Sequence, residues 1–231
     1  MEPKWQRISF MPATPLGEDG RRVTGSAAHI ALSRRAAAEG MVLLKNENET
    51  LPLKRGSRVA VFGKAQADYV KGGGGSGDTT VAYVCSLAQG LRMKQDEGKI
   101  EIFEPLERFY AEDVQAQYAA GATPGKTREP ILDDTLVQQA RAFTDTAVIT
   151  ICRFSGEDYD RTGQPHDGDY FLSFEEEHMV RKVLAAFPRV AVVLNTGGMM
   201  DTLWFKDNPA VGAALLAWQG GMEGGLAAAD L

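Results

Sequence analysis

The chain has 231 residues, of which 44% are hydrophobic and 24% charged, an ordinary composition for one globular α/β domain with a sizeable core. Its formal net charge of -6 and the lack of a basic stripe disfavour nucleic acid as a partner. The opening residues have no apolar region and no stretch reaches about 18 uninterrupted apolar residues, so neither a signal peptide nor a membrane span is predicted.

Short apolar runs alternate with helical patterns along the chain. The first helix is predicted over 26–40, with Ser26 as its N-cap. Strands are predicted at 58–63, 99–105, 146–153, 189–195 and 211–218. Further helices are predicted at about 81–93, 105–120, 133–144 and 173–187, the last opening with a capping box of Ser173 and Glu176. This alternation predicts an α/β fold, a three-layer sandwich with a mostly parallel sheet and helices on both faces.

The two cysteines, Cys85 and Cys152, lie within apolar patterns and lack the spacing of metal ligands. Buried free thiols are the expected state. Together with the missing signal peptide, they indicate a reducing compartment, so a cytoplasmic location is expected.

A glycine-rich run, 72–77, follows the first of these five strands, on the edge of the sheet where such folds bind ligands. Gly72, Gly74 and Gly77 satisfy the G-x-G-x-x-G pattern, but the run begins well after the strand ends near Gly63, and no Walker lysine follows. A flexible surface loop, a linker and a loop that something approaches closely are the other interpretations. The linker is the weaker of these, because helix and strand patterns continue on both sides.

A long acidic connection, 152–173, follows the third of these strands. Asp158, Asp160, Gly163 and Asp169 fall in the register of a calcium-binding loop, but Thr162 stands at its fifth position and a strand precedes it. A solvated acidic loop is a second interpretation. A carboxylate used for acid/base chemistry is the third, and spacing alone does not choose among them.

Several segments in order resemble one known family. They are "EGMVLLKNENETLPL" (39–53) with "RVAVFGKAQ" after it, "GGGGSG" (72–77), "RFSGEDYDR" (153–161), "VVLNTGGMMD" (192–201) and "ALLAWQGGMEGGLAAADL" (214–231). They are similar to the α/β sandwich domain of glycoside hydrolase family 3, the family of β-glucosidases and β-xylosidases. The chain departs from the family pattern at Asp158, where Gly or Ala is usual, and at Gly220 and Met222, which replace Pro and Gln.

The resemblance implies a retaining, exo-acting β-glycosidase, with β-glucosidase as the favoured activity, that removes terminal non-reducing β-linked sugars without a cofactor or a metal. In that family a barrel domain of the same polypeptide supplies the aspartate nucleophile, and the sandwich domain supplies the acid/base carboxylate. The family's glutamate falls on Glu157. The glycine loop would bring Ser76, Gly75 and Gly77 close to the hydroxyl groups of the carbohydrate.

The resemblance also implies a domain division: an N-terminal extension at 1–35 and the sandwich domain at 36–231, truncated at its C-terminal end and without its barrel. The early start of the sandwich domain resembles bacterial members in which this domain precedes the barrel. A cloned excerpt is the other explanation. The rival hypotheses are a non-catalytic nucleotide- or small-molecule-binding module and a catalytically silent interaction domain.

Overall fold

The computed structural model describes residues 25–79 and 81–231. Its centre is a six-stranded sheet with the order β1-β6-β5-β4-β2-β3. All neighbouring strands pair in parallel except β1, which pairs antiparallel with β6 at one edge. The strands are β1 (Val42–Asn46), β2 (Ser57–Phe62), β3 (Ile100–Ile102), β4 (Thr146–Arg153), β5 (Arg189–Thr196) and β6 (Val211–Leu216).

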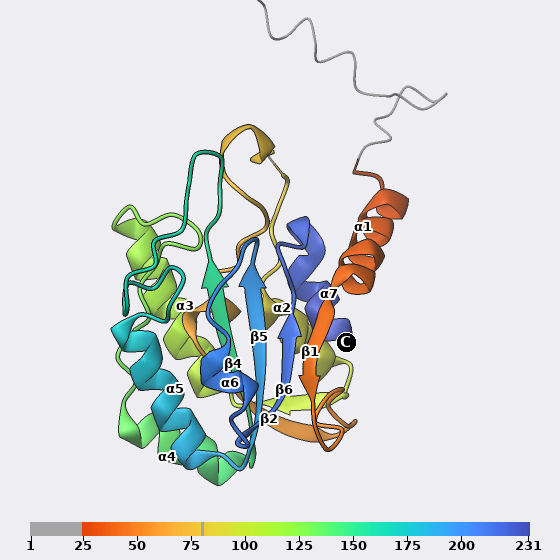
Figure 1. Cartoon of the computed structure of the whole chain (residues 1–231). Coiled ribbons are helices and arrows are strands. Elements are labelled where there is room, and N and C mark those ends of the chain that lie inside the picture. Colours follow the sequence, from red (N-terminus) through yellow and green to blue (C-terminus); the bar gives the residue numbers. More distant parts are fainter. Residues whose placement is uncertain (1–24, 80) are drawn as a thin grey trace, which may run out of the picture.

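Helices cover both faces of this sheet (Figure 1). The α-helices are α1 (Ala27–Gly40), α2 (Leu87–Asp96), α3 (Glu104–Ala119), α4 (Asp134–Phe143), α5 (Phe174–Ala186), α6 (Leu203–Lys206) and α7 (Gly224–Asp230). Short 3-10 turns lie at Lys64–Gln66, Gly75–Gly77 and Gly221–Glu223. The three-layer α/β sandwich with a mostly parallel sheet is confirmed.

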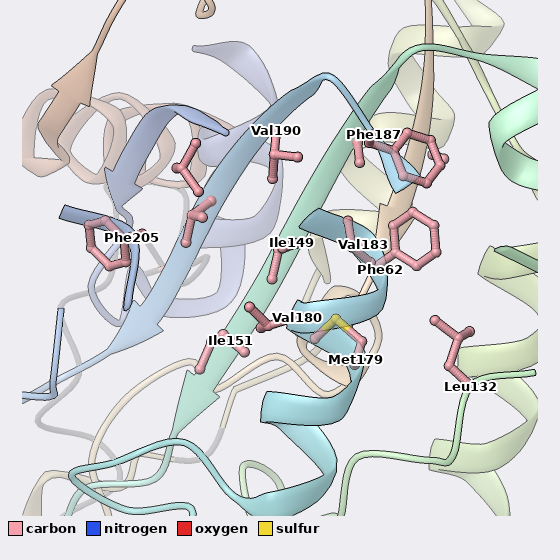
Figure 2. Close-up of a cluster of buried hydrophobic side chains, with 14 of the residues drawn as sticks. Phe62, Leu132, Ile149, Ile151, Met179, Val180, Val183, Phe187, Val190 and Phe205 are labelled. Carbon is pink, nitrogen blue, oxygen red and sulfur yellow. The ribbon is translucent and has the colours of Figure 1, made fainter. Parts of the chain in front are cut away.

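The larger hydrophobic core lies between the sheet and α3, α4, α5 and α6. Figure 2 shows how Met179 and Val180 of α5 lie close to Ile149 and Ile151 of β4. All four side chains are at most 4% exposed. Burying an aliphatic side chain of this size stabilises the fold by about 1.5–3 kcal/mol, so this contact contributes to holding α5 against the sheet.

The opposite face of the sheet packs against α2 and α7 through a second core. Successive strand residues point to opposite faces, so Val148 lies in this core while its neighbours Ala147 and Ile149 lie in the other one. Because β4 is buried along its whole length, it reads as a continuous apolar run rather than as an alternating one.

The structure adds one strand that the sequence patterns did not predict. β1 carries exposed apolar side chains and shows no alternation of buried and exposed positions, so its periodicity gives no strand signal. Antiparallel pairing with β6, far away in the sequence, defines it instead.

Two predicted boundaries were also wrong. The helix expected from residue 81 begins only at Leu87, where Ser86 forms a capping box with Gln89. The strand expected over 99–105 ends at Ile102, because α3 begins at Glu104 with Pro105 in its first turn.

The expected extension at 1–35 lies largely outside the described residues. Within them, α1 runs through residue 36 without a break. No described helix is both long and apolar enough to span a bilayer.

Candidate active site

Two loops rise above the carboxyl ends of the parallel strands, at the top of Figure 1: the glycine loop after β2 and the acidic loop after β4. Their backbones are hydrogen-bonded to each other. The N–H of Gly74 donates to the carbonyl of Ser155 at 2.8 Å, and the N–H of Glu157 donates to the carbonyl of Gly74 at 3.2 Å. The two segments that the sequence singled out therefore form one structure.

Glu157 and Ser76 lie in direct contact across these loops. The Ser76 backbone N–H donates to Oε2 of Glu157 at 2.9 Å, and the Ser76 hydroxyl donates to the same oxygen at 2.8 Å. Both donors stabilise the carboxylate form, so they hold the pKa of Glu157 below its usual value. Glu157 is exposed, so the carboxylate is open to a ligand.

Gly75 is required by geometry at this contact. Its φ of +85° lies in the left-handed region, and a Cβ there would lie 2.5 Å from Cβ of Glu157. Gly77 differs, because no atom of the described chain lies within 4 Å of the place where its Cβ would be. Gly75 thus makes room for Glu157 itself, whereas the space beside Gly77 is open.

This difference predicts opposite behaviour for two neighbouring substitutions. Gly75→Ala is expected to lower the free energy of unfolding by roughly 1–3 kcal/mol through backbone strain and the clash with Glu157. Gly77→Ala is expected to change it by less than about 0.5 kcal/mol. Urea unfolding of both variants measures the difference.

A bulkier substitution at Gly77 tests the expectation that this residue lies close to the carbohydrate. In an enzyme that contains this domain and a barrel, Gly77→Val should raise KM while stability stays unchanged. Unchanged kinetics would mean that Gly77 faces only solvent.

The acidic loop is held by two ion pairs, one buried at its start and one partly buried within it. At its start, the Arg153 guanidinium binds both carboxylate oxygens of Glu176 at 2.7 Å, and each side chain is only 3% exposed. Further out, Arg161 pairs with Asp169 at 2.6 Å and donates to the hydroxyl of Thr196 at the end of β5. Hydrogen bonds and ion pairs therefore connect the loop to the ends of β4 and β5 and to the first turn of α5.

The calcium-loop interpretation gains no support from the positions of these side chains. Asp169 accepts hydrogen bonds from Arg161 and from the Thr162 backbone. Over residues 25–79 and 81–231, no group of three or more His, Cys, Asp or Glu side chains is arranged to hold a metal ion. The turn at Asp158 has a φ of +59°, a conformation that Asp tolerates better than most residues.

Three residues that sequence reasoning did not single out complete this edge of the sheet. Asn195, buried at the end of β5, accepts from the N–H of Val70 at 2.7 Å and donates to the carbonyls of Val70 and Trp218. Trp218 follows β6 and has a φ of +53°, unusual for a bulky residue. Gln219 lies 3.0 Å from the hydroxyl of Ser155. The only sequence signal for these hydrogen bonds was an Asn at the end of an apolar predicted strand.

A buried polar network lies beneath the glycine loop. Asp68, which is fully buried, pairs with Lys64 and accepts hydrogen bonds from Tyr118 at 2.6 Å and from the N–H of Gly125 at 2.7 Å. Cys152 is buried next to this network, and burial raises the pKa of its thiol to about 12. Cys85 is only partly buried, and both thiols are free. The network connects the start of the glycine loop to α3 and to the segment that follows it.

Solved structures share this architecture. A β-glucosidase from Paenibacillus barengoltzii superimposes with a TM-score of 0.80 at 35% identity, over 89% of this chain and 23% of that one. β-Glucosidase 3B from Thermotoga neapolitana, solved in complex with glucose, gives a TM-score of 0.76 at 33% identity, over 88% of this chain and 28% of that one. The fold is thus that of one α/β domain found within larger β-glucosidases.

The sequence comparisons identify the family. Residues 41–231 match the "Glycosyl hydrolase family 3 C-terminal domain". β-Glucosidase A of Butyrivibrio fibrisolvens is 48% identical over 99% of this chain and 30% of its own length. A β-glucosidase of Ruminococcus albus is 36% identical over 81% of this chain and 20% of its own length. The chain belongs to glycosyl hydrolase family 3, and it spans less than a third of these relatives.

Proposed function

We propose that this chain provides the acid/base carboxylate and part of the sugar-binding site of a retaining, exo-acting β-glycosidase, with a terminal β-glucoside as the favoured substrate. The observation that carries the proposal is the position of Glu157. Its exposed carboxylate stands above the carboxyl ends of the parallel strands and directly faces the glycine loop. The naming of the relatives as β-glucosidases and the glucose complex of the Thermotoga enzyme support the sugar.

The proposed division of labour follows from the mechanism. A retaining glycosidase uses two carboxyl groups about 5–5.5 Å apart, one as nucleophile and one as acid and then base. Glu157 takes the second role, and a barrel domain of the same polypeptide takes the first. The glycine loop lies beside the terminal sugar, where Ser76 is in reach of a sugar hydroxyl and Gly77 leaves its space open. No cofactor is needed for this chemistry.

The 231-residue chain by itself is expected to fold but to hydrolyse essentially no aryl β-glucoside, because the covalent step needs the nucleophile of the barrel. The measurement is release of the phenol by the purified chain, with a cooperative urea transition as the control for folding. Robust turnover by a preparation free of other glycosidases would contradict the proposal.

A nucleotide-binding module is the second candidate, and the local geometry disfavours it. A dinucleotide site needs its glycines at the turn that opens a helix. Here the glycine run forms a short 3-10 turn at Gly75–Gly77, and the next helix begins only at Leu87. Calorimetric titration of the isolated chain with nucleotides separates the two hypotheses, because only the module should bind them.

A further inference from the structure

The Ser76–Glu157 contact poses a chemical problem for the proposed reaction. Cleavage begins with a protonated acid, yet both donors of Ser76 converge on one oxygen of Glu157 and favour the ionised form. The sugar-free arrangement is therefore suited to the base and not to the acid. Loss of one of these two hydrogen bonds in the complex with substrate would weaken this preference.

The hydroxyl of Ser76 is the group that can change partners. It carries a single proton, so it cannot donate to Glu157 and to a sugar oxygen at the same time. A 3-10 turn of only three residues, Gly75–Gly77, carries it, and no side chain caps this turn. The turn is exposed, so a rotation of the Ser76 side chain meets no buried packing.

Among the described residues, no group other than Ser76 sets the protonation of Glu157; the barrel nucleophile of the proposed mechanism would raise the pKa of Glu157 in the free enzyme and in the complex alike. Within the described residues, only Ser76 donates a hydrogen bond to its side chain. Three of the surrounding cations form ion pairs with other carboxylates: Lys71 with Asp78, Arg153 with Glu176, and Arg161 with Asp169. A fourth, Lys126, lies over the rings of Phe154 and Tyr159. The neighbouring carboxylates Asp158 and Asp160 are exposed to solvent. Among the groups of this chain, Ser76 is therefore the one whose movement would change the protonation of Glu157.

We propose that Ser76 is a positioning residue that couples sugar binding to the protonation of Glu157. In the free enzyme its hydroxyl donates to Glu157 and favours the carboxylate. When the terminal sugar binds, the hydroxyl donates to a sugar oxygen instead, and Glu157 becomes a better proton carrier as the glycosidic bond comes within reach. The inference rests on the proposed function, because it requires Glu157 to be the acid.

The test is the pH dependence of an enzyme that contains this domain and its barrel, with a β-glucoside whose leaving group is poor. The alkaline limb of kcat/KM reports the acid in the free enzyme, and that of kcat reports it in the complex. The wild-type limb is expected at higher pH in kcat than in kcat/KM. Ser76→Ala should move the kcat/KM limb to higher pH, leave the kcat limb in place, and so reduce the separation.

Two further measurements make this outcome specific. Ser76→Ala should also lower kcat/KM at its optimum by about 2- to 12-fold, the value of one hydrogen bond to the sugar. Ser76→Thr keeps the hydroxyl and should restore the wild-type separation of the limbs. A purely structural serine would change rates without moving one limb relative to the other.

Other outcomes overturn the inference. If both limbs move together, or neither moves, Ser76 does not change partners. A dinitrophenyl glucoside needs no acid, so its kcat/KM should lack the alkaline limb of Glu157. If the limb persists with the dinitrophenyl substrate, it does not report the acid, and the inference fails. If Glu157→Gln keeps the limb with the poor leaving group, the acid is another group, and the proposed function fails together with the coupling.

Discussion

Glu176→Gln is expected to lower the free energy of unfolding of this domain by about 3–5 kcal/mol, because it leaves the charge of Arg153 buried without a partner. Both side chains are 3% exposed, and two hydrogen bonds of 2.7 Å join them. The remaining guanidinium protons are donated to the carbonyls of Cys152, Asp169 and Phe171. Because these hydrogen bonds fix the Arg153 guanidinium inside the protein, it cannot rotate into solvent to regain hydration when its carboxylate partner is removed.

A double-mutant cycle separates the interaction energy between Arg153 and Glu176 from the contribution of their other contacts. Arg153→Met alone should cost a similar amount, since it strands the carboxylate, whereas Arg153→Met combined with Glu176→Gln should cost clearly less than the sum. Urea unfolding at constant pH measures all four proteins.

The control is a second ion pair of similar length on the surface. Arg58 and Glu101 lie 2.8 Å apart, but their side chains are 58% and 53% exposed. Glu101→Gln should therefore cost less than about 1 kcal/mol. Equal effects at the two sites would show that burial does not control the strength of the Arg153 pair.

The local sequence patterns predicted the elements whose own residues define them. Ser173 and Glu176 form the capping box that was expected at the start of α5. The buried runs of β4 and β5 lie within a residue of their expected ranges. The segment before Leu87 is different, because a tertiary bond from the N–H of Cys85 to the carbonyl of Met222 fixes it as a loop. Local sequence patterns could not predict this bond, because Met222 lies far from Cys85 in the sequence.

The candidate site shows the same division. The resemblance placed Glu157 and Ser76 on two separate loops, and the structure brings their side chains together. The charge environment could not be predicted, because Arg153 and Arg161 are close to Glu157 in sequence but bind other carboxylates. The backbone N–H and the hydroxyl that lower the pKa of Glu157 both belong to Ser76, 81 residues away in the sequence.

Glu157→Ala, in an enzyme with this domain and its barrel, is expected to cost about 10²- to 10⁴-fold in rate for a β-glucoside with a poor leaving group, because nothing then protonates the departing oxygen. A dinitrophenyl leaving group needs no proton. Its glycosylation step should survive, and the glycosyl-enzyme should accumulate, because water no longer has a general base.

Azide supplies the sharper readout, because it attacks the intermediate without a general base. Adding azide to Glu157→Ala should restore turnover of the dinitrophenyl glucoside and yield the β-glycosyl azide, with retained configuration. Asp158→Asn is the matched control: it removes the adjacent exposed carboxylate, tolerates the left-handed backbone at this position, and should show no azide dependence. If Glu157→Ala loses both substrate types equally and azide has no effect, Glu157 is structural. Asp160, exposed on the same loop, then becomes the candidate to test.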